Sequence, residues 1–128
     1  MKNILVTNNP DVRDKFQDRF QLDYLENHGY IQLLEHVRDM IHKGHQLLTH
    51  PLSGSIKPNE TPYKSVILSS KKGELDSSGL SIVEDSIISA RKFITNRPTP
   101  DWPDHVLEDF RVIDLSLMEN VIEKLGHN

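Results

Sequence analysis

The chain has 128 residues, of which 36% are hydrophobic and 27% are charged, and its formal net charge is −4. This balance is typical of a folded globular protein, so we expect a single domain over residues 1–128. The sequence contains no cysteine, which excludes a thiol nucleophile, a redox disulfide and a thiolate zinc site. A negative net charge is unfavourable for binding nucleic acid, which usually requires a basic surface.

Hydropathy along the chain predicts no contact with a membrane. No apolar stretch approaches the roughly 20 residues of a transmembrane helix. The segment 1–8 becomes polar too early for a secretory signal peptide. We therefore expect a cytoplasmic protein.

The first residues of the chain predict a buried strand followed by a helix. Ile4, Leu5 and Val6 are consecutive and apolar, as in a strand that is covered on both faces. Asn9 is a favourable N-cap, and Pro10 suits the first position of a helix because its missing N–H would lack a partner there anyway. We expect this helix to span about ten residues.

The middle of the chain predicts a helix and three short strands. Residues 22–25 are a short second strand in this interpretation. Apolar residues at helical spacing then mark a helix from Gly29, which ends at Gly44, a typical left-handed cap. Residues 46–49 are predicted as a third strand and residues 65–69 as a fourth, whose direction the sequence leaves open.

The C-terminal third of the chain predicts two helices. Ser81 and Glu84 have the spacing of a capping box near the start of a long amphipathic helix. A proline-rich connection follows over residues 95–103. Residues 110–113 are compatible with a fifth strand, and we expect Asp114 to cap the final helix.

This alternation of strands and helices predicts an α/β fold with three layers. We expect a mostly parallel sheet of roughly four to five short strands, in an order near 2-1-3-4-5, with helices on both faces. Strands 1 and 3 would then be neighbours, with their carboxyl ends at one edge of the sheet. Open α/β sheets bind ligands at such an edge, so we expect residues 7–9 to face the loop that begins at Thr49.

Residues 50–64 form an unusually long predicted loop, because its prolines and its glycine prevent a long helix. Loops of this length in compact domains are often functional, although packing of the loop on its own side chains is the alternative. Short polar side chains, lysines and the positive end of the first helix favour a small anion such as phosphate, carboxylate or sulfate. The candidate ligand-binding residues are Thr7, Asn8, Asn9, Thr49, His50, Ser53, Gly54, Ser55, Lys57, Asn59, Thr61 and Lys64.

Catalysis has less support in the sequence than binding. His50 is the candidate acid–base group, and hydrogen bonding of its ring to the loop backbone is the alternative. His42 and His45 lie near it in sequence, but the strand would separate His45 from His50 by roughly 16 Å, so we predict no metal site. The sequence has no recognisable nucleophile–base pair, phosphate-binding loop or dinucleotide motif, so we expect no cofactor.

Two segments of the chain resemble the GrdX family. One is HKGHQLLTHPLSGSIKPNETPYKS at residues 42–65, and the other is the opening strand with Thr7-Asn8-Asn9-Pro10. The GrdX family consists of small proteins encoded with the glycine reductase system of amino-acid-fermenting anaerobes. The resemblance implies an association with glycine reductase components, and it implies neither a reaction nor catalytic residues.

Three functions remain open at this point. Glycine reduction proceeds through selenol, thiol and acyl-thioester chemistry, whereas the sulfur atoms of this chain belong to methionines. The resemblance therefore implies an accessory or regulatory protein. The loop residues favour a small anionic ligand for it, and the sequence does not rank acetyl phosphate, glycine and nucleotides as ligands. The second function is a small acyl- or phosphoryl-transfer enzyme that uses His50, with Lys57 or Lys64 holding the substrate. The third is an interaction module that docks on a partner through the segment around Trp102, and a homo-oligomer is also compatible with the sequence.

Overall fold

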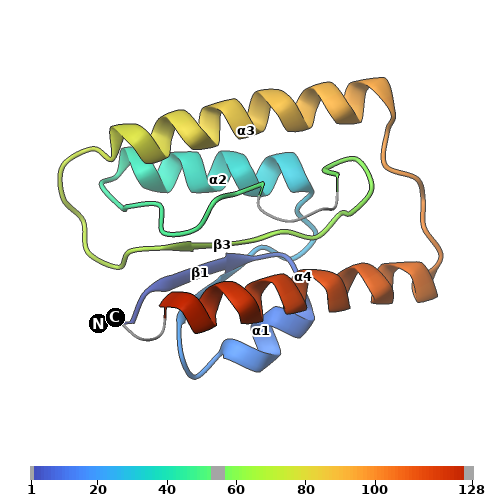
Figure 1. The fold of residues 1–128 in the computed structure, drawn as a ribbon, viewed down its shortest axis with the longest axis horizontal. Coiled ribbons are helices and arrows are strands. Elements are labelled where there is room, and N and C mark those ends of the chain that lie inside the picture. The colour runs from blue at the N-terminus through green and yellow to red at the C-terminus, as the bar shows by residue number, and fades with distance from the viewer. Residues whose placement is uncertain (1, 53–56, 126–128) are drawn as a thin grey trace.

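The computed structural model describes residues 2–52 and 57–125, which form three strands and four helices. Figure 1 shows the sheet between two layers of helices, with α2 and α3 on one face and α1 and α4 on the other. The elements in chain order are β1 Ile4–Thr7, α1 Pro10–Phe16, β2 Gln21–Tyr24, α2 Tyr30–His42, β3 Ser65–Leu68, α3 Ser77–Asn96 and α4 Asp104–Leu125.

The sheet is mixed and has the strand order β2-β1-β3. Strand β1 pairs in parallel with β2, where Ile4 lies opposite Gln21, and antiparallel with β3, where Ile4 lies opposite Leu68. The predicted sheet of four to five mostly parallel strands in the order 2-1-3-4-5 is therefore wrong. The position beside β1 that we expected for residues 46–49 is occupied by β3.

Residues 46–49 do lie along the sheet, but on the outer side of β3. They contribute one isolated antiparallel bridge, between Leu47 and Leu68, with a hydrogen bond of 2.9 Å from the Leu48 N–H to the Ile67 carbonyl. The Thr49 hydroxyl then accepts the Ile67 N–H at 3.0 Å. This side chain takes the place of a backbone partner, so the pairing does not continue as a regular strand.

The residues predicted to begin α1 and to end α2, Asn9 and Gly44, have these roles in the structure. The Asn9 side chain caps α1 by accepting the Asp11 N–H at 3.0 Å. Helix α1 ends at Phe16, earlier than expected, although Phe20 beyond it still packs into the core. Gly44 follows α2 with φ of 107°, a conformation that favours glycine.

Helices α3 and α4 both begin earlier in the chain than the sequence predicts. The cap of α3 is Asp76, whose carboxylate accepts the Gly79 N–H at 3.0 Å, so Ser81 lies inside the helix. Residues 110–113 are not a strand, and Asp114 is not a cap, because both lie within α4. The Pro103 carbonyl accepts the Val106 N–H at 3.0 Å and starts this helix ten residues before Asp114.

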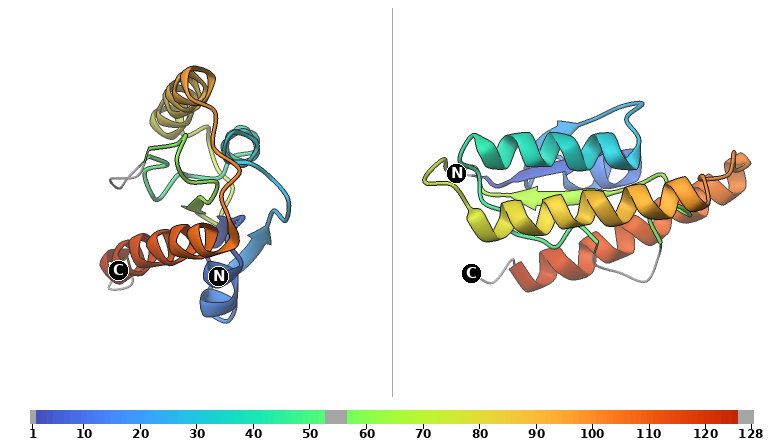
Figure 2. Two further views of the ribbon diagram at one scale, coloured as in Figure 1. Left: turned by 90° about the vertical axis from the view of Figure 1, so that its right-hand side faces the viewer. Right: turned by 90° about the horizontal axis from the view of Figure 1, so that it is seen from above.

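Alternating strand residues build one apolar core on each face of the sheet. Ile4, Val6 and Leu68 face α2 and α3, whereas Leu5 and Ile67 face α1 and α4. The end-on view in Figure 2 shows α3 and α4 on opposite sides of the strands. Among the described residues, no helix combines the length and apolar character that crossing a membrane requires.

Replacing Gly44 with alanine should lower the free energy of unfolding by about 2 kcal/mol, because its positive φ disfavours a side chain. A Cβ at Gly44 would also lie 2.7 Å from the Gly73 carbonyl oxygen. Gly73→Ala is the control, since a Cβ there meets no atom within 4 Å, and we expect a change within about 0.5 kcal/mol. Urea unfolding of both variants checks this, and equal losses would contradict it.

Candidate functional site

The turn after β1 contacts the end of the long loop at Pro62 and Lys64, and the polar groups of Asn8 are already hydrogen-bonded. The Asn8 carboxamide nitrogen donates to the carbonyls of His28 and Pro62, both at 2.9 Å. Its oxygen accepts the Lys64 N–H at 2.9 Å. Asn8 therefore holds the loop end against the β1–α1 turn.

Thr7 and Asn9 belong to a buried polar network that joins β1, β3 and α4. The Thr7 hydroxyl lies 2.7 Å from the Ser65 hydroxyl, which donates to the Asp114 carboxylate at 2.9 Å. The Asn9 carboxamide donates to the same carboxylate oxygen at 3.0 Å. Asp114 is 5% exposed, and burial raises the pKa of its carboxyl, against the opposing effects of these two hydrogen bonds and the Lys64 charge.

Lys64 and Thr61 lie in a small pocket beside this network. The pocket has a volume of about 20 Å³, and Tyr30 and Asp114 also line it. Burial lowers the pKa of the Lys64 ammonium, and the charge of Asp114 opposes that shift. A space of this size holds about one water molecule, so we do not place a phosphate there.

The first residues of the long loop are divided between the sheet and the surface. Thr49 is buried against β3. His50 is exposed, and its Nδ1 accepts the Leu52 N–H at 3.1 Å. This contact is the loop-backbone hydrogen bond that we considered as the alternative to catalysis. Ser53, Gly54 and Ser55 lie outside the described residues.

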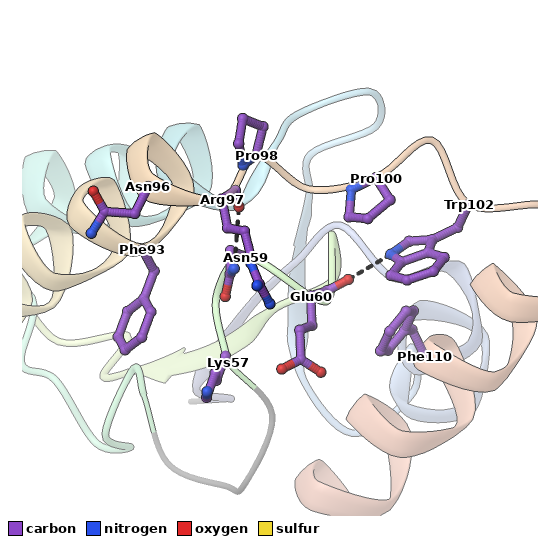
Figure 3. A pocket seen from close by; sticks show the side chains of 10 residues that line it. All are labelled: Lys57, Asn59, Glu60, Phe93, Asn96, Arg97, Pro98, Pro100, Trp102 and Phe110. Carbon is purple, nitrogen blue, oxygen red and sulfur yellow. Dashed lines mark hydrogen bonds between the residues drawn. The ribbon is translucent and has the colours of Figure 1, made fainter.

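Lys57 and Asn59, from the same predicted set, line a larger pocket of about 540 Å³. Its walls are the turn at residues 57–60, the end of α3, the proline-rich connection and the first half of α4, as Figure 3 shows. The lining residues are Lys57, Asn59, Glu60, Phe93, Asn96, Arg97, Pro98, Pro100, Trp102 and Phe110.

Asn59 is the most buried polar group in this wall, with an exposed fraction of 8%. Its carboxamide nitrogen donates to the Arg97 carbonyl at 3.1 Å. No hydrogen bond reaches its Oδ1 from any residue that the structure describes, although this oxygen is buried. A buried acceptor without a donor is costly, and because this oxygen is fully buried, a ligand in the pocket does not reach it.

Charged and aromatic side chains complete the pocket. Lys57, Arg97 and Glu60 are exposed at its rim. The Trp102 indole donates to the Glu60 carbonyl at 2.7 Å and packs on Phe110, with 5.7 Å between the ring centroids. This hydrogen bond and ring contact fix the proline-rich connection against the turn at residues 57–60.

Sequence reasoning missed most of this wall. Arg97 and Phe110 lie far along the chain from Lys57, and no local pattern relates them. Asp114 was also misread, although it lies four and eight residues before Met118 and Ile122, which form the buried stripe of this helix.

The fold and the pocket define a small three-layer α/β protein with a charged and aromatic pocket between its long loop and the ends of its two last helices. The sequence model of the GrdX-like protein family matches residues 4–123. The chain therefore belongs to this family, which confirms the resemblance seen in the loop and the first turn. Comparison with curated proteins and with solved structures finds no match.

Proposed function

We propose that this protein is an accessory protein of glycine reductase metabolism that binds a small anionic ligand in the pocket of about 540 Å³. Membership of the GrdX-like family supports the metabolic association. The observation that carries the binding site is the concave wall of this pocket, which is lined by the cations Lys57 and Arg97. Positive side chains in a concave site are typical of anion binding.

This proposal retains Lys57 and Asn59 from the predicted set and gives other members a structural role. The Asn8 carboxamide is saturated by backbone groups. Thr7 and Asn9 hold Asp114 and Ser65 in the buried network. The ligand therefore lies on the far side of the loop from the β1–α1 turn, against α3 and the connection to α4.

We favour binding over acyl or phosphoryl transfer because His50 does not line this pocket. Its ring is engaged with the loop backbone at Leu52. Docking of a partner on Trp102 also has less support, because this side chain is half-buried and bound to Glu60.

The test is anion binding by a Lys57→Met, Arg97→Met double variant. In the unmodified protein, acetyl phosphate and inorganic phosphate should shift the amide resonances of residues 57–60 and 97, with weaker binding at high salt. The double variant should bind at least about tenfold more weakly, about 1.4 kcal/mol, because both charge-assisted contacts are lost.

The control is Lys71→Met with Lys72→Met, which removes two exposed positive charges outside the pocket lining. This pair changes the net charge equally, so it should bind phosphate as the unmodified protein does. Equal weakening in both double variants would mean that net charge, not the pocket, attracts the anion.

A further inference from the structure

We propose that Lys64 forms a covalent imine with a small aldehyde, in a second site that is separate from the anion pocket. This site is the pocket of about 20 Å³ beside the buried network, which Lys64, Asp114 and Tyr30 line together. Lys64 directly precedes β3, Asp114 lies within α4 and Tyr30 begins α2. The second site does not depend on the proposed anion site.

Three polar atoms of these pocket residues have no hydrogen-bond partner among the residues that the structure describes. They are Nζ of Lys64, Oδ1 of Asp114 and Oη of Tyr30. Their residues are only 5–6% exposed. Unlike Oδ1 of Asn59, none of the three atoms is fully buried, so their remaining accessible surface faces the pocket. Buried polar groups are normally paired, so three unpaired groups around one space indicate a binding site.

The surroundings of Lys64 favour a nucleophilic amine. Phe110, Ile113 and Leu117 form an apolar wall of the pocket. Burial lowers the pKa of the Lys64 ammonium, although the charge of Asp114 opposes this shift. More of the neutral amine is therefore present near pH 7 than at an exposed lysine. A desolvated lysine of this kind is typical of sites that form an imine with a carbonyl compound.

Asp114 can carry the proton that imine formation moves, because it lines the pocket without forming an ion pair with Lys64. Its Oδ1 takes a proton from the Lys64 ammonium. The resulting amine attacks the carbonyl carbon, and a proton passes from nitrogen to the carbonyl oxygen, which gives a carbinolamine. Asp114 then returns its proton to the hydroxyl, water leaves, and the nitrogen lone pair completes the C=N bond. One ammonium becomes one iminium, so the charge beside Asp114 is unchanged and no co-reactant is needed.

The size of the pocket selects an aldehyde over a ketone. A volume of about 20 Å³ holds roughly one water-sized group, which suits a carbonyl carbon that carries hydrogen and one substituent. The substituent extends toward Ile113, which lines the pocket and is 37% exposed. The second substituent of a ketone would enter the apolar wall. Burial raises the pKa of Tyr30, so its hydroxyl remains a donor for the carbonyl oxygen.

The test is reductive labelling of the unmodified protein near pH 7 with acetaldehyde and cyanoborohydride, which converts an imine into a stable secondary amine. Peptide mass spectrometry measures the rate at each lysine. Lys64 should be labelled at least about tenfold faster than the exposed Lys71 and Lys72, because each unit by which a pKa falls gives about ten times more amine. With acetone this rate ratio should be at least about tenfold lower, and the exposed lysines correct for the lower reactivity of a ketone.

A variant at Asp114 tests the proton transfer. Asp114→Asn removes the proton carrier and keeps the size of the side chain, so the rate at Lys64 should fall at least about tenfold while the rate at Lys71 stays the same. Asp109→Asn, at an exposed position of α4, is the control and should be labelled as the unmodified protein is. Thermal unfolding identifies any variant that loses structure, and the comparison of lysines within the unmodified protein does not depend on the variants.

Three outcomes contradict the inference. Labelling of Lys64 at or below the rate of Lys71 overturns the imine site, and so does an equal rate ratio with acetaldehyde and acetone. An unchanged rate at Lys64 in folded Asp114→Asn overturns the role of Asp114 as proton carrier. The anion site at Lys57 and Arg97 survives each of these results, because its test measures phosphate binding and not the reactivity of Lys64.

Discussion

Asp114→Ala should lower the free energy of unfolding by about 3–5 kcal/mol, the largest effect expected of a single polar residue in this protein. The substitution leaves the Asn9 amide and the Ser65 hydroxyl without their acceptor. It also removes the negative charge that favours the buried Lys64 ammonium.

Urea unfolding measures the loss of stability in Asp114→Ala. Asp109→Ala is the control on an exposed position of the same helix, with an expected change within about 0.5 kcal/mol. A loss below 1 kcal/mol for Asp114→Ala would contradict the network.

The isosteric Asp114→Asn adds a pH dependence to this prediction. Burial raises the pKa of Asp114 above its ordinary value of 3.8, so the folded protein holds this proton more tightly than the unfolded chain. The stability from this group is therefore fully present below pH 3.8 and is lost as the pH rises through the raised pKa. The asparagine variant does not titrate, so its stability relative to the unmodified protein should increase from pH 4 to pH 8. A constant difference would show that this carboxyl has an ordinary pKa.

Asn8→Ala should cost about 3 kcal/mol, the second largest effect expected here. The substitution leaves the buried Lys64 N–H without its acceptor, which costs about 1–3 kcal/mol. It also removes the donor of the partly buried hydrogen bonds to the carbonyls of His28 and Pro62. Asn3→Ala, at an exposed position before β1, is the control. Thermal and urea unfolding check both variants.

Phosphate binding distinguishes a structural Asn8 from a ligand contact. In the proposed arrangement the folded Asn8→Ala protein should bind phosphate as the unmodified protein does. A variant of normal stability that has lost phosphate binding would return the ligand site to the β1–α1 turn.

Elements with strong local signals could be predicted from the sequence. The apolar run of β1, the Asn9 cap and the apolar stripe of α2 depend on residues that are neighbours in the chain or one helical turn apart. Gly44 is also local, because its role depends on its own φ. These signals lie within a few residues of one another, so a single sequence carries them.

Strand order and the extent of α4 could not be predicted in this way. Residues 46–49 have the apolar pattern of a strand, but the partner of a strand is chosen by packing over the whole sheet. Residues 110–113 hold three apolar side chains and Arg111, a short pattern that suits a strand and a helix equally well. The structure shows a helix there, because α4 begins at Asp104 and continues through these residues.

The candidate site likewise has some features that the sequence predicts and others that only tertiary packing sets. The sequence by itself determined that residues 50–64 would form an irregular loop, because the prolines and the glycine there prevent regular structure. Tertiary structure decided that Asn8 is saturated, that Asp114 is buried, and which side chains stand opposite Asn59. Arg97, Trp102 and Phe110 reach this pocket because α3 and α4 pack on opposite faces of the sheet and their connection must cross its edge. That proximity depends on distances through space between segments roughly 40–50 residues apart, for which a single sequence carries no local signal.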